Sequence, residues 1–588
     1  MNIRTTAPGH QTLSCLRRWA SVSLCLISSF ALNAPSLALT NDAQPGEQPG
    51  EQPAEQLRAA IAQRIQIDAL ENRSGPSAAS LAKIQANYVG AAHAPLWVSH
   101  DGPTARAREL AQAISALTRD GLNPKDYDIA AISSLVAQGN GIAELADLDV
   151  RLSLALVHAA SDLASGRLEP RQVNPKLYIY PQDIDHATVL AGARNEEDVA
   201  AYLQSFQPGQ ANYHRLKSAL AHYRTLAADT SWPTIDSGDT LKRGMEDPRV
   251  GLVRSRLRLL EDLPLGTPLA TAPNRYDDSV AASVRHFQAR HGLDQDGKVG
   301  KNTLAALNVS PSQRVEQILL NLERRRWMPD KFEPRYVFVN LADFYLKVVE
   351  NIDGRERTIH TTEVVVGKRY HQTPEFSHKI RYLVINPYWN VPVSIARNEL
   401  FAKFKKDPSY IQARGYELFD GYGAGAGIVD PELIDWESLS RRDFRYKIRQ
   451  RPGPENALGT IKFMFPNRHN IYLHDTPSRT LFKRTERAFS HGCIRVKDPD
   501  LLAATLLQWQ SDWPTKRVRQ TVADGERTVV SLAEPVPVHL AYITAWVNKN
   551  GAVHFRNDVY DRDKSLAAVL LPALSTDRTP PVTTAPSS

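Results

Sequence analysis

The sequence contains little cysteine and, outside its first 38 residues, no long apolar run. Three cysteines occur in 588 residues, at positions 15, 25 and 493. Beyond residue 38, no apolar run reaches the ~18 residues that a membrane-spanning helix needs. Apolar residues make up 42% and charged residues 23% of the chain, as in ordinary globular proteins, which excludes wholesale disorder and a collagen-like structure. At roughly 100–200 residues per domain, the length predicts about three or four domains.

The first 38 residues have the pattern of a secretory signal peptide. Three arginines precede or open an apolar segment at residues 19–32, and no acidic residue occurs in this part of the chain. Small residues at 36–38, Ser-Leu-Ala, form an A-x-A-like cleavage site. We therefore expect residues 1–38 to be a signal peptide and the protein to be exported. A signal that stays uncleaved would act as an inner-membrane tether.

Removal of this segment changes both the charge and the cysteine content. It takes away three arginines and no acidic residue, which lowers the net charge from +7 to +4. This weak positive charge is compatible with a polyanionic neighbour, but nucleic acid is not an expected partner of an exported protein. Cys493 then remains as a lone cysteine, so no internal disulfide can form. A lone exported thiol is either an accident or a free reactive group.

The N-terminal half of the chain divides into three predicted segments. Residues 39–56 are rich in Pro, Gly, Gln and Glu and lack the apolar residues for a core, which predicts a disordered tether. Residues 57–230 consist of helix-forming stretches and are predicted to be a helical scaffold domain. Residues 238–310 form a compact unit of three predicted helices. The apolar faces of its first two helices are predicted to be Val250, Leu252, Val253, Leu257, Leu259 and Leu260, and Val280, Val284 and Phe287.

The C-terminal half is predicted to be mostly β. Apolar residues alternate with a period of two over much of residues 335–565, which indicates strands joined by hairpins, one of them at 538–555. A charged and aromatic stretch at about 396–450, with a glycine-rich run at 421–427, interrupts the strands and is predicted to be an insertion. Residues 576–588 are rich in Pro, Thr and Ser and are predicted to be a disordered tail. The expected fold class is therefore multidomain α+β.

The lone thiol lies in a motif suited to nucleophilic chemistry. Cys493 follows Ser-His-Gly, and His474 ends an apolar strand nineteen residues upstream. A thiol is mostly protonated at neutral pH, and a neighbouring imidazole can take its proton for attack on a carbonyl. His474 and His491 both qualify as this base, and their spacing alone does not decide between them. Glycine at position 492 permits close backbone approach, and N–H groups around Gly492 and Cys493 are candidate oxyanion donors.

This arrangement resembles a known catalytic signature. His474, fifteen intervening residues and then Ser-His-Gly-Cys at 490–493 resemble the signature of the L,D-transpeptidases, the YkuD family. The resemblance implies that His474 is the base and Cys493 the nucleophile. It also implies that the backbone carbonyl of Asp475 orients the imidazole. The residues that would orient the catalytic groups or bind the oxyanion are Gly492, Asp475, His491 and Ser490.

Two further segments, 386–392 and 451–459, also resemble that family. Arg495 stands where asparagine is common, as in the larger members. Its guanidinium would hold a substrate carboxylate through two hydrogen bonds, or it would form a structural ion pair. The predicted substrate-binding residues are Arg495, Tyr472, Trp389 and Asn456.

The other parts of the chain extend the resemblance. Residues 284–307 carry the pattern F-Q-x-x-x-G-L-x-x-D-G-x-x-G-x-x-T-x-x-x-L and resemble the small three-helix peptidoglycan-binding domain. Together with the helical scaffold and the insertion, the whole resembles the large periplasmic L,D-transpeptidases of Gram-negative bacteria. In those enzymes the insertion is a cap over the site. The resemblance therefore implies a periplasmic location.

The resemblance also implies a reaction. The Cys493 thiolate would attack the carbonyl before the D-alanine at position four of a donor tetrapeptide stem, and an acceptor stem amine would resolve the thioester into a 3→3 cross-link. Water as acceptor would make the enzyme an L,D-carboxypeptidase, and a lipoprotein lysine would make it an anchoring transpeptidase. An amino acid as acceptor would give exchange. No metal and no organic cofactor is required.

Other interpretations explain the sequence less well. A zinc site at His474, Asp475, His491 and Cys493 would not have a standard zinc spacing. A papain-like protease has the cysteine first and the histidine far downstream, the reverse of the order here. A non-catalytic wall-binding protein would explain the 238–310 unit but not Cys493.

Overall fold

The computed structural model describes residues 51–71, 76–228, 231–264, 266, 272–352, 355–510 and 512–575. The predicted signal peptide, the tail 576–588 and most of the predicted tether lie outside these residues. Where the end of the tether is described, the prediction is wrong, because helix α1 begins at Glu51. Leu57, Ile61 and Ile65 of this helix are buried, which explains why the helical structure extends through this region. No helix among the described residues is long and apolar enough to cross a membrane.

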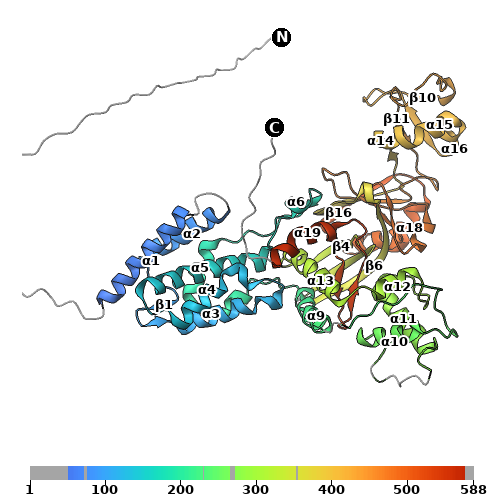
Figure 1. Cartoon of the computed structure of the whole chain (residues 1–588). Helices are drawn as coiled ribbons and strands as arrows, with labels where there is room; N and C mark the ends of the chain where they lie inside the picture. The colour runs from blue at the N-terminus through green and yellow to red at the C-terminus, as the bar shows by residue number, and fades with distance from the viewer. Residues whose placement is uncertain are drawn as a thin grey trace, which may run out of the picture. The chain divides into compact units, whose positions relative to one another are not determined.

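The N-terminal domain is helical, as predicted (Figure 1). Its longest helix, α5 (Ile142–Ser165), is buried along most of its length. The surrounding helices share one apolar core with it, because each presents an apolar stripe toward α5. These helices are α1 (Glu51–Glu71), α2 (Pro76–Gly90), α3 (Ala105–Ser115), α4 (Ile129–Gln138), α7 (His186–Asn195) and α8 (Val199–Gln204).

Three short helices with a core of their own form the next unit. They are α10 (Arg249–Leu259), α11 (Asp278–Arg290) and α12 (Lys301–Leu307). The predicted apolar face of α11 is confirmed by the burial of Val280, Val284 and Phe287. On α10 the prediction is partly wrong, because Leu252 and Leu259 are 39% and 43% exposed.

The C-terminal region, which is predicted to be catalytic, is built on a large mixed sheet. Strand β12 pairs with both β13 and β7, so eight strands, in the order β12-β13-β15-β6-β5-β4-β16-β7, close on themselves around an apolar core. Helices α17 (Pro499–Leu507) and α18 (Thr515–Ala523) contribute to the same core. The strand bounds are β4 Arg335–Asn340, β5 Tyr345–Ile352, β6 Arg355–Gly367, β7 Glu375–Ile385, β12 Ile461–Met464, β13 Leu473–His474, β14 Ala488–Ser490, β15 Ile494–Val496 and β16 Thr528–Ala541.

The predicted hairpin at 538–555 is shorter in the structure. Residues 538–541 belong to β16, which pairs with β4 in parallel and with β7 in antiparallel orientation, and Val538 and Leu540 are buried there. Only β17 (Ala545–Val547) and β18 (Val553–Phe555) form the hairpin. The alternation of apolar residues therefore runs from the large sheet into the two-stranded β17–β18 sheet. The sequence pattern alone did not show where one sheet ends and the other begins.

Helices join the scaffold to the catalytic region. Helix α13 (Pro311–Arg326) packs against α9 (Ala211–Ala228) and α19 (Arg562–Ser575). Arg324 of α13 forms a buried ion pair with Asp563 at the start of α19. Strand β3 (Leu177–Tyr178) adds to the large sheet beside β7. The C-terminal helix thus continues ten residues past the predicted domain end at 565.

The predicted insertion is a small folded subdomain, which we call the cap. Its four-stranded sheet has the order β10-β9-β11-β8, and it has a separate apolar core that includes Phe404, Trp436 and Phe444. The glycine-rich run 421–427 lies between β9 and β10. The cap elements gather together in Figure 1. They are β8 (Trp389–Asn390), α14 (Val393–Ile395), η4 (Ala396–Leu400), α15 (Phe401–Lys406), α16 (Ser409–Ala413), β9 (Tyr416–Phe419), β10 (Ile428–Val429) and β11 (Lys447–Gln450).

Candidate active site

Strand pairing places the predicted catalytic residues on one face of the sheet. Strands β13 and β15 are parallel, with His474 opposite Arg495, and β12 places Lys462 opposite His474. Since side chains alternate along a strand, Tyr472 and Cys493 share this face, one step along the strands. The opposite face is apolar and fully buried, through Phe463, Leu473 and Ile494. This alternation fixes which side chains reach the site.

His474 is held as a neutral base. The side chain is 5% exposed, and its Nδ1 lies 2.5 Å from the carbonyl oxygen of Asp475. A carbonyl only accepts hydrogen bonds, so Nδ1 carries the proton and Nε2 keeps its lone pair. Burial, together with the smaller effects of the nearby charges of Arg495 and Lys462, lowers the pKa of His474 to about 3. The imidazole can therefore accept a proton at neutral pH.

The side chain of Asp475 is itself held in place by Thr460 and Arg479. Its Oδ2 accepts hydrogen bonds from the N–H and hydroxyl of Thr460, at 2.8 and 2.9 Å, and its Oδ1 lies 3.0 Å from Arg479. A Cβ atom at Gly459 would lie 2.3 Å from Oδ2, so glycine is required there. The predicted orienting role of Asp475 thus has a geometric basis in its carbonyl, and its carboxylate fixes the position of that carbonyl.

Cys493 is a half-buried, free thiol. Its Sγ–H lies 3.5 Å from the carbonyl oxygen of Asn470. Burial raises the pKa of Cys493, although hydrogen bonds from Tyr472 and the charges of Lys462 and Arg495 act in the opposite direction. The resting thiol is therefore protonated beside a neutral imidazole, and it needs a base during attack.

The turn before the thiol is held by hydroxyl groups. The buried Ser490 Oγ donates to the carbonyl of Cys493 at 2.5 Å and accepts from the N–H of Gly492 at 3.1 Å. Thr373 Oγ1 donates to the carbonyl of Gly492 at 2.7 Å. Gly492 has φ +115°, a conformation that favours glycine. The N–H of Gly492 thus donates to Ser490 in this structure, and its role as an oxyanion donor stays a prediction.

His491 points to the cap and not to the thiol. Its Nε2 contacts a carboxylate oxygen of Glu399 in η4, and its ring centroid lies 4.9 Å from that of His371. Burial lowers the pKa of His491, and the charge of Glu399 opposes that shift. These contacts suit a residue that positions the 490–493 loop against the cap.

Two cations face the thiol, and the sequence analysis identified only one of them. Arg495 is mostly enclosed and has no carboxylate partner among the described residues, so the alternative of a structural ion pair finds no support there. The Lys462 ammonium lies 3.8 Å from the centroid of the Tyr472 ring, and burial lowers the pKa of Lys462. The signal for Lys462 was its position as a polar residue in the apolar run 461–465.

Two predicted substrate-binding residues, Asn456 and Trp389, lie in the cap or beside it. Asn456 is 1% exposed, and its amide bonds the carbonyls of Pro387 and Arg451, both at 2.9 Å. Its Oδ1 accepts the N–H of Leu458 at 2.8 Å, so direct substrate binding by Asn456 is contradicted. Trp389 lies in β8 and packs against the apolar core of the cap, and its substrate contact stays a prediction.

Within the described ranges, no group of three or more His, Cys, Asp or Glu side chains is arranged to hold a metal ion. The site is instead a thiol, an imidazole and two cations on one sheet face. This arrangement can carry out acyl transfer, because it combines a nucleophile, a base and groups that bind carboxylates.

Comparison with known proteins defines the class of this site. Residues 334–530 match the YkuD family, described as "L,D-transpeptidase catalytic domain". Residues 82–220 match a family described as "Scaffold domain", and residues 246–307 match one described as "Putative peptidoglycan binding domain". The chain therefore contains an L,D-transpeptidase catalytic domain of the YkuD family, together with a scaffold domain and a peptidoglycan-binding domain. The predicted multidomain α+β fold class is confirmed.

One curated relative agrees with this assignment over part of the chain. A protein of Haemophilus influenzae named "Putative L,D-transpeptidase" is 36% identical over 255 residues, which are 43% of this chain and 50% of that protein. The chain thus matches about half the length of this curated relative. A solved structure from Clostridium acetobutylicum, a fused Zn-dependent amidase/peptidase/peptidoglycan-binding domain-containing protein, is 12% identical with a TM-score of 0.15. It covers 52% of this chain and 100% of its own, and at that TM-score it carries no structural argument.

Proposed function

We propose that this protein is a peptidoglycan L,D-transpeptidase that forms 3→3 cross-links through a thioester on Cys493 and releases D-alanine. The observation that carries the proposal is the parallel pairing of β13 and β15, which places a neutral His474 and the Cys493 thiol on one sheet face. The YkuD match over residues 334–530 supports the same chemistry. The match of residues 246–307 supports peptidoglycan as the substrate and the cell envelope as the location, in the periplasm.

In the acylation step, His474 Nε2 takes the proton of the Cys493 thiol. The sulfur attacks the carbonyl carbon between the third residue and the D-alanine of a donor tetrapeptide stem. The oxyanion needs an N–H donor, and we assign the Cys493 N–H, since the Gly492 N–H is bound to Ser490. The C–N bond then breaks, the imidazolium protonates the leaving D-alanine amine, and a thioester remains on the sulfur.

In the second step, an amine of an acceptor stem attacks the thioester. His474 takes a proton from this amine, the C–S bond breaks, and the sulfur is reprotonated. The two stems are then joined by an amide bond. Arg495 and Lys462 bind stem carboxylates beside the sulfur, because both cations share its face of the sheet.

The chemical identity of the acceptor decides whether the thioester yields a cross-link, a hydrolysed stem or an anchored lipoprotein. Water gives an L,D-carboxypeptidase, and a lipoprotein lysine gives an anchoring enzyme. We favour the stem amine because a folded cap contacts the active-site loop through Glu399 and His491, and such a cover limits the access of water.

The test is the intact mass of the protein after incubation with a tetrapeptide stem, combined with analysis of the released products. We expect a thioester adduct, free D-alanine and a cross-linked dimer of stems. Cys493→Ala should fold and form no adduct. Cys493→Ser should be nearly inactive, because a hydroxyl is far less acidic than a thiol. Unchanged turnover in Cys493→Ala would refute the assignment, and hydrolysed stems without dimers would favour the carboxypeptidase.

A further inference from the structure

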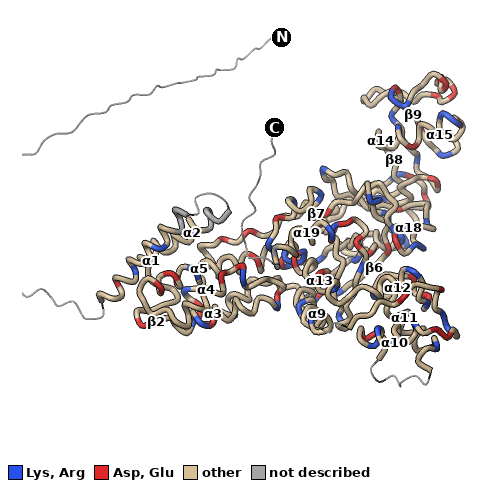
Figure 2. The backbone as a smooth tube through the Cα atoms, in the orientation of Figure 1, with Lys and Arg blue, Asp and Glu red and all other residues tan. Residues whose placement is uncertain are grey.

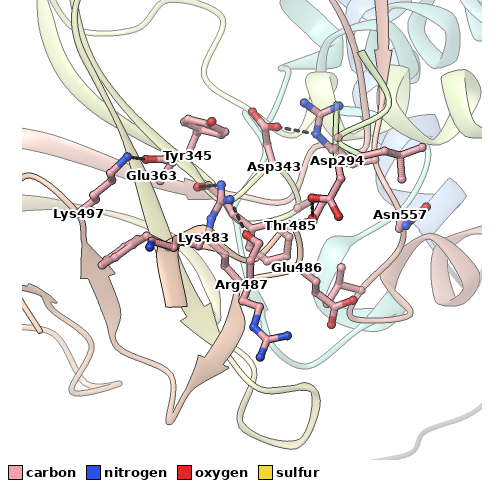
Figure 3. Close-up of a pocket in the computed structure, with 18 of the residues that line it drawn as sticks. Asp294, Asp343, Tyr345, Glu363, Lys483, Thr485, Glu486, Arg487, Lys497 and Asn557 are labelled. Atoms are coloured by element: carbon pink, nitrogen blue, oxygen red, sulfur yellow. Dashed lines mark hydrogen bonds and ion pairs between the residues drawn. The ribbon is translucent and has the colours of Figure 1, made fainter. Parts of the chain in front are cut away.

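A cavity lies at the junction of the peptidoglycan-binding domain and the catalytic domain (Figure 3). Its volume is about 1270 Å³, above the usual range of ~300–1,000 Å³ for small-ligand pockets. One wall is the loop 292–295 after helix α11, and another is the segment 479–489, which lies between His474 and Cys493 in the chain. We call this space the junction cavity.

The walls of the junction cavity are tied to each other. Arg556 of the catalytic domain donates to the carbonyl of Arg290 at 2.9 Å and pairs with Asp343 at 2.6 Å. Thr485 donates to Asp294, a contact drawn in Figure 3. The cavity is therefore bounded on both sides by residues in direct contact across the two domains.

Some charges of the junction cavity are neutralised within the protein and others are free. Glu363 and Lys497 pair at 2.5 Å, on one side of the cavity in Figure 3. Lys483, Arg484 and Glu486 are exposed, and among the described residues none of them has an ion-pair partner. The free charges of this cavity thus include two cations and one carboxylate on the same short segment.

Aromatic surface lies beside these free charges. Phe489 is 36% exposed and lines the cavity together with Tyr345. Over the molecule as a whole, basic and acidic residues are interspersed in every domain, in keeping with its small net charge (Figure 2). Binding here therefore requires a ligand with its own mixture of charges and apolar groups, and not a uniformly anionic polymer.

We propose that the junction cavity is an exosite that binds a peptidoglycan stem peptide other than the one that reacts at Cys493. Free stem peptides carry carboxylates that suit Lys483 and Arg484, an amine that suits Glu486, and aliphatic groups that suit Phe489. The volume accommodates a peptide with part of its glycan. This inference rests on the proposed function, and it gives the peptidoglycan-binding domain a role in a composite site.

The exosite is connected to the active site by a residue that contacts both. Arg479 lines the cavity and pairs with Asp475, whose carbonyl binds His474. A stem peptide bound in the exosite holds its glycan strand next to the segment 479–489, which lies between His474 and Cys493 in the chain. It therefore acts on substrate capture, and its loss should raise KM while kcat is retained.

The test compares full-length Lys483→Glu/Arg484→Glu with the matched control Lys516→Glu/Arg517→Glu. The control changes an equally exposed adjacent pair on α18 that does not line the cavity. Co-sedimentation with peptidoglycan sacculi should show at least about fivefold weaker binding for the first variant and unchanged binding for the control. The milder Lys483→Gln/Arg484→Gln should weaken binding less, and circular dichroism checks the folding of all three.

Two soluble competitors separate peptide from glycan recognition: a free stem peptide, and glycan strands freed of their stem peptides by an amidase. The stem peptide should lower the binding of the unmodified chain to sacculi to the level of the charge-reversed variant, and the glycan strands should have less effect. Equal binding of all variants, or a stem peptide that does not compete, would overturn the exosite. Acylation of Cys493 by a small reactive acyl donor should be unchanged in all variants. If the unmodified chain is not acylated, the proposed function fails instead, so the two failures are distinguishable.

Discussion

The strongest quantitative consequence of the site concerns the pH dependence of acylation. A histidine with an ordinary pKa of ~6.5 would be about 90% neutral at pH 7.5 and about 10% neutral at pH 5.5. A rate that depends on such a base would fall roughly tenfold over this interval. His474 has a pKa of about 3, because it is buried and faces Arg495 and Lys462. At that pKa, more than ~99% of the imidazole stays neutral between pH 5.5 and 7.5.

We therefore expect the acylation rate of Cys493 to change by less than about twofold between pH 7.5 and 5.5. The assay is the rate of adduct formation with a small neutral acyl donor, followed by intact mass, since a neutral donor adds no titration of its own. His474→Ala, measured at each pH, gives the rate without the base. An alkaline rise should come above the ordinary thiol pKa, because burial raises the pKa of Cys493. A tenfold loss toward pH 5.5 would refute the neutral-base arrangement.

Four substitutions test the site and its surroundings. His474→Ala should lower the acylation rate at least ~100-fold, and His491→Ala should cost less because it contacts the cap; the opposite ranking would exchange their roles. Lys462→Met should raise the pKa of the nucleophilic thiol and the KM for stem peptides, since its charge favours the thiolate; an unchanged alkylation pH profile would contradict this. Gly459→Ala should reduce both thermal stability and acylation, because its Cβ would meet the Asp475 carboxylate at 2.3 Å with φ at +60°; unaltered values would show that the loop adapts.

The sequence determined the domain order and the chemical identity of the site. Helical segments, a three-helix unit and period-two strands are local patterns, and local patterns persist in the structure. The lone thiol in a Ser-His-Gly-Cys motif, with His474 nineteen residues upstream, predicted Cys493 as the nucleophile, and this role stays a prediction. Local patterns failed where one apolar alternation ran through two sheets, at residues 538–555, and where helix α1 began within the predicted tether.

Only the tertiary structure decided which residues face the thiol. His474 and His491 are equivalent by spacing, and the pairing of β13 with β15 separated them, since it puts His474 beside Arg495 while His491 reaches Glu399 of the cap. Lys462 joined the site through a third strand, a long-range pairing that no local pattern encodes. Asn456 is buried, and its amide is hydrogen-bonded to backbone groups of Pro387, Arg451 and Leu458, which leaves none of it for a substrate. Strand register and the pairing of buried polar groups are properties of the assembled sheet. They determine which of these side chains face the thiol and which are hydrogen-bonded within the protein.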